Sequence, residues 1–477
     1  MLKSLKKALW DKFLKNFRNF GLLLSIIYFF HLSCTPQEEV ITPEFNASLN
    51  FSADTVLFDT IFSSVGSLTK RIKIYNRNIN AVNISNISLG LSSASPYTIF
   101  LNGEPGANFN DTYLLGGDSL MILVTVNIDP QDQNLPYLVK DSIVFNTNGQ
   151  QQDIKLIAYG QDAHFIGNSI LPCNTVWTAD RPYVIYKSIL IDSLCNLTIE
   201  KGARIYFNYN SALYVKGSLK VAGEKEQKVI FRNERMDGSY KNSPGQWLGI
   251  FFLEGSKDNY IDFAEIRNAN YGIRMGTPDD DDIPDLILSN TIIENMTSAG
   301  ILCFTSDLSA FNVLVNNCGD YTVGNFAGGN YSYNHCTFAN YNFMFFRQDP
   351  SVVFSDNIIL ANNSILTADL SVNIHNSIVW GTLKDEIILS NAGGSVFTFF
   401  SSHNILRTTN GELGIKNNIL NSENVNFPRF KKPEEHIFLL DTLSPAKDAG
   451  VPSEVVFDLQ GEPRSETPDI GAYERKE

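Results

Sequence analysis

The sequence predicts an all-β protein in which an antiparallel sandwich precedes a stack of short-stranded coils. Aromatic residues are frequent, with 33 Phe and 19 Tyr against 6 Met, and this balance favours strands over helices. Alternating β-branched runs fill the first third of the chain, and a repeat of about 22 residues follows in the second half. With 43% apolar and 18% charged residues, the chain fits neither a disordered protein nor a coiled coil.

The charge balance narrows the choice of partners. The 477-residue chain has a formal net charge of −14. Residues 1–33 hold six Lys or Arg and one Asp, so the rest of the chain carries 31 positive and 50 negative charges. A chain this acidic is poorly suited to bind nucleic acid through bulk charge. We expect no nucleic acid partner and no cofactor.

Residues 1–33 have the features of a secretory signal peptide. Basic residues precede the apolar run GLLLSIIYFFHLS, which is followed by Cys34. About 14 apolar residues are too few to span the hydrocarbon core of a membrane, which needs about 20 in a helix. The segment resembles a bacterial lipoprotein signal, and this resemblance implies that Cys34 is lipidated and becomes the mature N-terminus. The alternative is an uncleaved membrane anchor with a chance cysteine.

Residues 34–45 lack an apolar period and predict a tether. Their Glu38-Glu39 pair resembles the acidic signals that send some Gram-negative lipoproteins to the outer cell face. The resemblance implies an outer membrane lipoprotein that is exposed on the cell surface.

Residues 46–162 predict the sandwich. Six or seven alternating runs are separated by turn residues such as Asn102-Gly103 and Gly116-Gly117. This spacing is typical of an antiparallel sandwich of about 100 residues. The region resembles the immunoglobulin-like (Ig-like) domains that precede larger modules in bacterial surface proteins, which implies a spacer or docking role.

Residues 163–440 predict a parallel β-helix. Six apolar runs begin at steps of 22, 23, 21, 19 and 28 residues, at Asn290, Asn312, His335, Asp356, His375 and His403. Such steps suit one coil of a solenoid whose coils stack at about 4.8 Å. The run LTIEKGARIYF, with its glycine bends, resembles the opening turns of right-handed parallel β-helix proteins of the pectate-lyase-like kind.

The aligned column of Asn, Asp and His could suggest a metal site. However, His335 and His375 would lie two coils apart, or about 9.6 Å, which is too far for two imidazoles to share a zinc ion. We therefore expect a polar ladder that forms hydrogen bonds at a bend of each coil.

Residues 441–477 carry three motifs, SPAKDAG, DLQGEPR and DIGAYE. Together they resemble the C-terminal module called choice-of-anchor Q, which ends many secreted bacterial β-helices. Because a solenoid needs a polar or folded end, we expect this module to cover the last apolar coil. The whole chain resembles right-handed β-helix lipoproteins of Gram-negative bacteria, a family that implies a fold and a location rather than a reaction.

The cysteines allow one disulfide in the β-helix. Cys173 and Cys195 are 22 residues apart, which is one coil period, so adjacent coils could place them within disulfide distance. The alternative is that both are core residues. We expect Cys303, Cys318 and Cys336 to be free, buried thiols.

A run of four aspartates offers the hard oxygen ligands that Ca²⁺ prefers: Asp279, Asp280, Asp281 and Asp282. Four consecutive side chains cannot all point at one ion, and the closing Glu of an EF-hand is missing. We expect a solvated loop and no metal site.

Aromatic residues are the best candidates to bind a ligand. Tyr240 and Trp247 lie in one predicted loop, and Tyr260, Tyr271 and Arg274 lie on neighbouring coils. Aromatic faces beside a few polar groups suit sugar rings. The alternative is that these side chains pack in or on the coil wall.

Signatures of known enzymes with this fold are incomplete in the sequence. The G-H-G and R-x-K elements of polygalacturonase-like hydrolases and the W-x-D-H element of pectate lyases are missing. Lys241, Arg267 and Arg274 could act as a base, but no spacing singles them out. The sequence favours a lipid-anchored, non-catalytic module that binds a neutral or cationic glycan or an envelope partner. The alternative is a polysaccharide lyase or glycoside hydrolase with an unfamiliar site.

Overall fold

The computed structural model describes residues 40–475 apart from 45–46, 237, 277–280, 282, 342–345, 415 and 421–426. The predicted signal peptide and Cys34 lie outside the described residues. Within them, no helix has the length and hydropathy needed to cross a membrane. The chain divides into two compact units, one ending near Ala158 and the other made mainly of Tyr159–Glu477.

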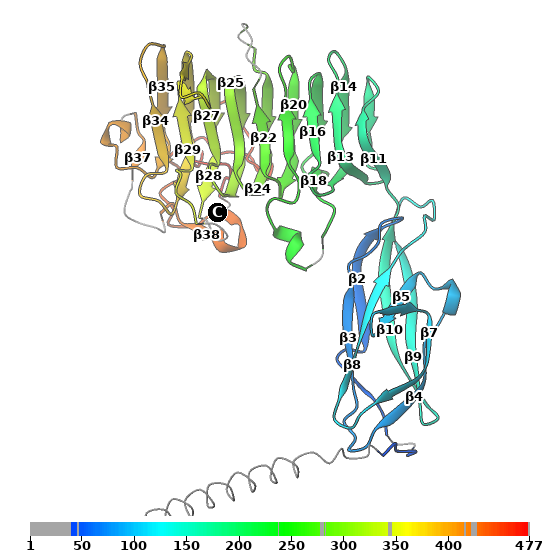
Figure 1. Cartoon of the computed structure of the whole chain (residues 1–477). Coiled ribbons are helices and arrows are strands. Elements are labelled where there is room, and N and C mark those ends of the chain that lie inside the picture. Colours follow the sequence, from blue (N-terminus) through cyan, green and yellow to red (C-terminus); the bar gives the residue numbers. More distant parts are fainter. Residues whose placement is uncertain are drawn as a thin grey trace, which may run out of the picture. The chain divides into compact units, whose positions relative to one another are not determined.

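Two antiparallel sheets form the N-terminal unit (Figure 1). One has the order β1-β3-β8-β5-β6 and the other the order β2-β10-β9-β4-β7. Their elements are β1 (Asn50–Phe51), β2 (Thr55–Phe62), β3 (Lys70–Tyr75), β4 (Val82–Leu89), η1 (Ser92–Ala94), β5 (Tyr97–Leu101), β6 (Glu104–Gly106), β7 (Asn108–Leu114), β8 (Ser119–Val126), β9 (Tyr137–Thr147) and β10 (Gln150–Gln161). Alternate residues such as Ile72, Ile74 and Ile122 are fully buried, as the alternating sequence pattern predicts.

A parallel β-helix forms the second unit, so the predicted all-β fold class is confirmed. Its 25 strands belong to one continuous sheet that winds around the axis (Figure 1). Most strands pair in parallel with the equivalent strand one coil away, as β14 does with β17 and β17 with β20.

The strands of the first coils are β11 (His164–Ile170), β12 (Thr175–Trp177), β13 (Tyr183–Ile191), β14 (Asn196–Glu200), β15 (Arg204–Phe207), β16 (Ala212–Val215), β17 (Ser218–Ala222), β18 (Val229–Asn233), β19 (Gly249–Phe252), β20 (Asn259–Asp262), β21 (Ala264–Arg267) and β22 (Tyr271–Met275). The later strands are β23 (Leu286–Ser289), β24 (Ile292–Met296), β25 (Ala299–Phe311), β26 (Leu314–Cys318), β27 (Val323–Asn334), β28 (Thr337–Asn340), β29 (Val352–Ser355), β32 (Leu370–His375), β33 (Ile378–Gly381), β34 (Ile387–Ser390), β35 (Phe397–Ser402), β36 (Ile405–Leu406) and β37 (Ile419–Leu420). Short 3-10 turns occur at η2 (Gly238–Asn242) and η3 (Gly411–Gly414).

Stacked apolar side chains fill the interior of the coils. Val221, Ile261 and Leu288 occupy one register position on successive coils, and none of them is exposed. Each coil therefore buries its apolar face only against its neighbours, as expected for a solenoid.

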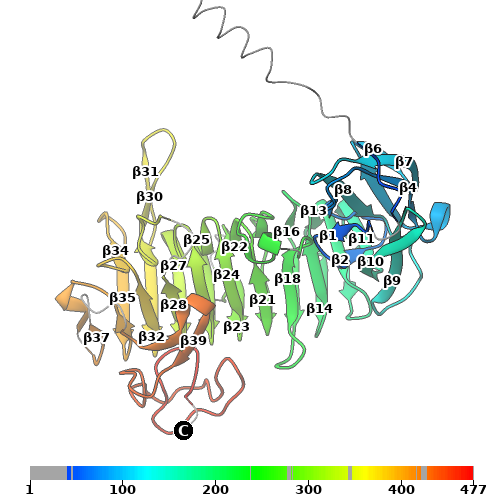
Figure 2. The same cartoon turned by 90° about the horizontal axis from the view of Figure 1, so that it is seen from below.

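A hairpin interrupts the repeat between β29 and β32. Its strands are β30 (Asn357–Ile359) and β31 (Ile365–Thr367), which pair antiparallel and project from the coils (Figure 2). The hairpin lengthens one coil, because His335 and the equivalent turn residue Asn376 are 41 residues apart.

Residues 427–475, which we call the C-terminal strap, lie along one flank of the β-helix (Figure 2). The strap includes β38 (Phe430–Lys432), η4 (Pro433–Glu435) and β39 (Ile437–Leu440), and β38 pairs antiparallel with β39. These residues are therefore not a coil, although the sequence placed them in the predicted β-helix of residues 163–440.

The strap covers an apolar outer column on the coils. Leu314, Ile378 and Ile405 point outward at one register position, yet each is at most 2% exposed because the strap packs on them. We expected the C-terminal segment to cover the last coil, but the apolar side chains of the strap cover the flank instead. The flank is where the coils carry outward apolar residues.

Cys173 and Cys195 form a disulfide in the structure, with Cα atoms 4.5 Å apart. Cys303, Cys318 and Cys336 are free and buried. Burial raises the pKa of both Cys318 and Cys336 to about 12, so these thiols are unreactive core residues.

Candidate functional site

One outer face of the β-helix carries apolar side chains where a solvated sheet would carry polar ones. A single outward register position runs through nine strands, from β11 to β34. It is occupied by Ile170, Leu190, Tyr214, Phe251, Arg274, Leu302, Gly324, Val353 and Ile388. We call this set the outward file. Its neighbours along β16, Leu213 and Val215, point into the core, so the file is a true outer row.

A second outward row of the β-helix, on another face of the coils, shows the contrast. It consists of Val176, Thr198, Lys220, Tyr260, Ile287, Ser309, Ser332, Asn373 and Phe400. Most of these residues are polar, as expected for a sheet that faces water. In the outward file, Gly324 and Val353 are buried, but the apolar members from Ile170 to Leu302 are exposed or partly exposed. Apolar side chains that gather on a soluble surface in this way are unusual and mark binding sites.

Aromatic rings lie in and beside the middle of the outward file: Tyr214 and Phe251 belong to it, and Tyr271, Phe304 and Phe326 flank it. The ring centroids of Tyr214 and Phe251 are 5.3 Å apart, and those of Phe251 and Tyr271 are 6.0 Å apart. Further along, Phe304 and Phe326 stack with centroids 6.0 Å apart. All five rings are half-buried, so each keeps some surface for a ligand.

Gly324 makes room for this ring cluster. A Cβ at this position would lie 2.8 Å from the ring of Phe326 and 3.3 Å from the ring of Tyr321. Any larger residue would displace a ring from the outer face.

Arg274 lies at the centre of the aromatic stretch. Its guanidinium carbon is 5.9 Å from the ring centroids of Phe251 and Tyr271 and 5.5 Å from that of Phe304. The side chain is exposed and makes no ion pair with any described residue. With Glu254, it borders a cavity of about 340 Å³. Its guanidinium can therefore donate hydrogen bonds to a ligand that lies on the rings.

The structure brings together only two of the five predicted ligand-binding residues, Tyr271 and Arg274. Trp247 is wrong as a candidate, because it is 1% exposed and belongs to the core. Its ring stacks on Phe207 at 4.1 Å, and its Nε1 donates a hydrogen bond to the carbonyl of Arg267 at 2.8 Å. A buried indole offers no face to a sugar.

Tyr260 lies in the mainly polar outward row and not in the outward file. Burial raises its pKa to about 12, with a further contribution from Asp262.

Tyr240 borders a different cavity of about 320 Å³. The guanidinium of Arg235 lies 3.5 Å from the centroid of its ring. Glu234 lines the same cavity; burial raises the pKa of its carboxyl group, and a hydrogen bond from Asn208 partly offsets that rise.

The sequence missed Tyr214, Phe251, Phe304 and Phe326. The sequence does carry a signal for some of them. In runs such as ALYV and GIFF, the outward aromatic residue stands between two apolar residues that point into the core. Only the register between coils shows that Tyr214 lies next to Phe251 and Phe304 next to Phe326 on the outer face.

The predicted polar ladder exists with two changes of membership. Asn290, Asn312, His335 and His403 all have left-handed backbone at equivalent turns, with φ between 47° and 53°. Asn312 donates a hydrogen bond to Asn290 at 3.0 Å.

The two changes lie beside the inserted hairpin. Asn376, with φ 50°, takes the place given to His375, and its amide is 3.1 Å from Nε2 of His335. Asp356 is not in the column, because it directly follows β29, before the hairpin, and the next member of the column comes only after the hairpin. At its own turn it accepts hydrogen bonds from Ala392 and Ser395.

A second asparagine ladder was not predicted. Asn268 donates to Asn233 at 2.7 Å, Asn295 to Asn268 at 3.1 Å and Asn317 to Asn295 at 2.6 Å. These side chains are buried, so the ladder satisfies polar groups inside the coil and is not a ligand site.

The described residues contain no group of three His, Cys, Asp or Glu placed to hold a metal ion. Of the aspartate run, Asp279, Asp280 and Asp282 lie outside the described residues. Asp281 is exposed and accepts a hydrogen bond from the backbone N–H of Ile283 at 2.8 Å.

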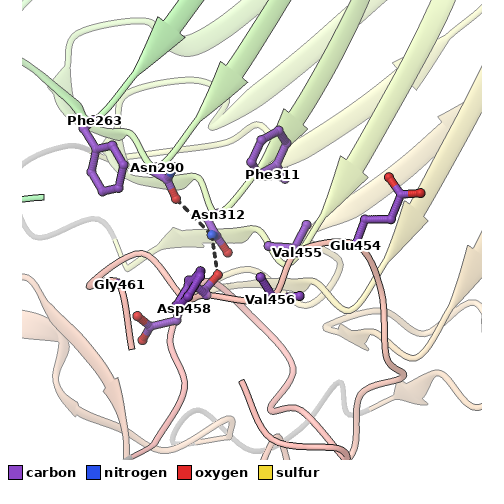
Figure 3. Close-up of a pocket in the computed structure, with 10 residues that line it drawn as sticks. Phe263, Asn290, Phe311, Asn312, Glu454, Val455, Val456, Asp458 and Gly461 are labelled. Atoms are coloured by element: carbon purple, nitrogen blue, oxygen red, sulfur yellow. Dashed lines mark hydrogen bonds between the residues drawn. The ribbon is translucent and has the colours of Figure 1, made fainter. Parts of the chain in front are cut away.

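A third cavity, of about 420 Å³, lies between the strap and the flank of the coils (Figure 3). Phe263, Phe311 and Val456 line it. Beside the cavity, the side-chain amide of Asn312 on the coils donates a hydrogen bond to the backbone carbonyl of Phe457 in the strap, at 2.7 Å. The hydrogen bond ties the strap to the polar ladder, which gives this cavity a structural role.

Comparisons with known proteins do not identify a family. No protein-family model and no curated protein matches the chain. Among solved structures, a protein of unknown function from Porphyromonas gingivalis W83 is 10% identical, with a TM-score of 0.19, over 26% of this chain and 59% of that one. A family 123 glycoside hydrolase from Clostridium perfringens is 10% identical, with a TM-score of 0.17, over 24% of this chain and 26% of that one.

The catalytic unit of a GH87 α-1,3-glucanase from Streptomyces thermodiastaticus strain HF3-3 is 8% identical, with a TM-score of 0.18. The match covers 71% of this chain and 83% of that chain. This chain spans less than two-thirds of the first two structures. At TM-scores this low, none of these likenesses supports a function.

Proposed function

We propose that this protein is a lipid-anchored cell-envelope protein that binds a glycan on the outward file without cleaving it. The basic leader, the short apolar run and Cys34 support lipid anchoring at the outer membrane. In this proposal the N-terminal unit acts as an Ig-like spacer, and the C-terminal motifs form a choice-of-anchor Q type module.

The observation that carries the binding role is the aromatic stretch of the outward file. Half-buried rings on consecutive coils present apolar faces, and Arg274 supplies fixed hydrogen-bond donors among them. Sugar rings have apolar C–H faces and polar edges, so they match this combination.

Binding is tested on an array of neutral and acidic polysaccharides with the secreted chain lacking its leader. Charged hydrogen bonds contribute about 1.5–3 kcal/mol, so Arg274→Gln should weaken binding by roughly tenfold or more. Arg274 is exposed, and the variant should fold normally. Tyr113→Ala, at a 59% exposed tyrosine on β7, is the matched control and should bind as the wild type does. Wild-type affinity in the Arg274 variant would contradict the proposed site.

Lipid anchoring has its own test. Replacing Cys34 by Ala removes the only sulfur to which the lipid can attach near the leader. The variant should leave the membrane fraction, and intact mass analysis of the wild type should show the lipid. Membrane retention of the variant together with an unmodified wild-type mass would contradict anchoring at Cys34.

A second candidate function is glycoside hydrolysis at the cavity beside Tyr240. The observation in its favour is Glu234, a carboxyl group with a raised pKa in a cavity that also holds an aromatic ring. Glycosidases of the common kinds need a pair of carboxyl groups, and Glu234 is the only one among the described residues that line this cavity. New reducing ends that disappear in Glu234→Gln would establish this alternative and overturn the non-catalytic proposal.

A further inference from the structure

We propose that the ligand of the outward file is an extended, neutral, β-linked glycan that lies along the β-helix axis with one sugar unit on each coil. The site runs from Tyr214 on β16 to Phe326 on β27. The inference rests on the proposed function and adds the linkage, orientation and length of the glycan.

The spacing of the rings along the site is close to the length of one sugar unit in an extended glycan. Successive coils place equivalent residues about 4.8 Å apart. The ring centroids along the site are separated by 5.3 to 6.0 Å, and Arg274 occupies the register position between Phe251 and Leu302. One sugar unit of an extended β-linked chain advances by a similar distance. The strands β16, β19, β22, β25 and β27 therefore provide about five consecutive subsites.

The width of the site carries the second step. The strip is a single row at Tyr214 and Phe251. On β25 and β27 a second outward row, Phe304 and Phe326, lies two residues along from the outward file, so the strip is one to two side chains wide. A stable protein interface needs about 800 Å² from each partner, which favours a broad patch. A peptide strand would need free backbone groups, but a sheet face has none, because its backbone bonds go to the neighbouring coils. A narrow ribbon of sugar rings fits this strip better than either.

Charge carries the third step. Arg274 is the single cation of the outward file, and Glu254 borders the same cavity. The chain as a whole has a net charge of −14, which would repel a polyanionic glycan. The guanidinium can instead donate hydrogen bonds to the hydroxyl groups of a neutral sugar.

The test measures affinity against chain length by titration calorimetry. The probes are the β-1,4-linked cello-, manno- and xylo-oligosaccharides from one to seven units, and the α-1,4-linked malto-oligosaccharides serve as the coiled comparison. For at least one β-linked series we expect an affinity gain of about threefold to tenfold per added unit up to about five units, then a plateau. The malto series should show no such growth.

Variants at the two ends locate the chain on the file. Tyr214→Ala and Phe326→Ala should each shorten the plateau by about one unit and leave the affinity for the disaccharide within twofold. Arg274→Gln, which alters an exposed side chain, should lower the affinity of the longer chains at least fivefold without affecting folding. Tyr113→Ala should change nothing.

Failure of the axial, β-linked assignment and failure of glycan binding itself give different results. A plateau at two units, or equal growth in the malto series, would overturn the axial, β-linked assignment while glycan binding stands. No binding of any glycan, with the array negative as well, would overturn the proposed function itself.

Discussion

His335 shows how one turn position constrains a residue. It lies in the column of left-handed turns, is fully buried, and accepts a hydrogen bond from the amide of Asn376 at Nε2. Burial, and then the nearby charge of Arg464, lower the pKa of His335 to about 2. The imidazole is therefore neutral in the folded protein at every physiological pH.

This burial predicts acid sensitivity of a defined sign. In the unfolded chain His335 titrates near 6.5, so below that pH the unfolded state binds a proton that the folded state excludes. Stability should fall by about 1.4 kcal/mol per pH unit between pH 6.5 and the folded pKa. Asparagine occupies the equivalent turns, so His335→Asn should keep the fold and remove this slope. Urea unfolding from pH 7 to 4.5 measures it.

The comparison is internal, because all other titrating groups are common to both proteins. His403→Asn, in the same column, is the control and should keep the wild-type slope. Equal slopes for the wild type and His335→Asn would show that His335 does not set the acid sensitivity.

At the scale of elements, the strap depends on a few polar contacts with the ladder. The side chain of Asn376 donates to the carbonyl of Val451 and accepts from its N–H, both at 2.9 Å, and its backbone carbonyl accepts from Gly471 at 2.7 Å. These bonds fix the middle of the strap against the coils.

Asn376→Gly keeps the left-handed turn but removes the side-chain bonds. We expect a loss of about 1–3 kcal/mol and faster cleavage of the strap by a protease, because hydrogen bonds contribute about 1 kcal/mol each. Asn363→Gly, at an exposed turn with φ 63°, is the matched control and should change stability by a few tenths of a kcal/mol. An unchanged cleavage rate in Asn376→Gly would mean that the apolar contacts alone hold the strap.

The sequence predicted the coils because their apolar runs recur, and it predicted the cysteine pair because that spacing is one coil. It misassigned Asp356 and His375 because the hairpin β30–β31 lengthens one coil, and a count of residues cannot distinguish an insertion from a turn. Trp247 was misassigned because an aromatic in a predicted loop can point either way. The outward file depends on register between coils, which no single run encodes.

At the scale of the whole molecule, the two compact units have separate cores, and we expect two unfolding transitions. The disulfide between Cys173 and Cys195 lies in the first coils of the β-helix. A reductant should lower the free energy of unfolding of the β-helix by about 2–4 kcal/mol and leave that of the N-terminal unit unchanged. Calorimetry with and without the reductant measures this. In the chain whose Cys34 is lipidated, a count of three thiols under unreduced, denaturing conditions supports the bridge, whereas five would contradict it.

The strap also selects for one register of the coils beneath it. Stacked repeats tolerate slippage, because a coil that pairs one step out of register still buries apolar surface. The strap, however, binds Asn312, Thr337 and Asn376, which lie on successive coils at fixed heights along the axis. A skipped coil would displace these partners by about 4.8 Å and leave the strap unmatched over an exposed apolar flank. The strap can therefore dock fully only on a β-helix in which every coil beneath it is present and in the correct register.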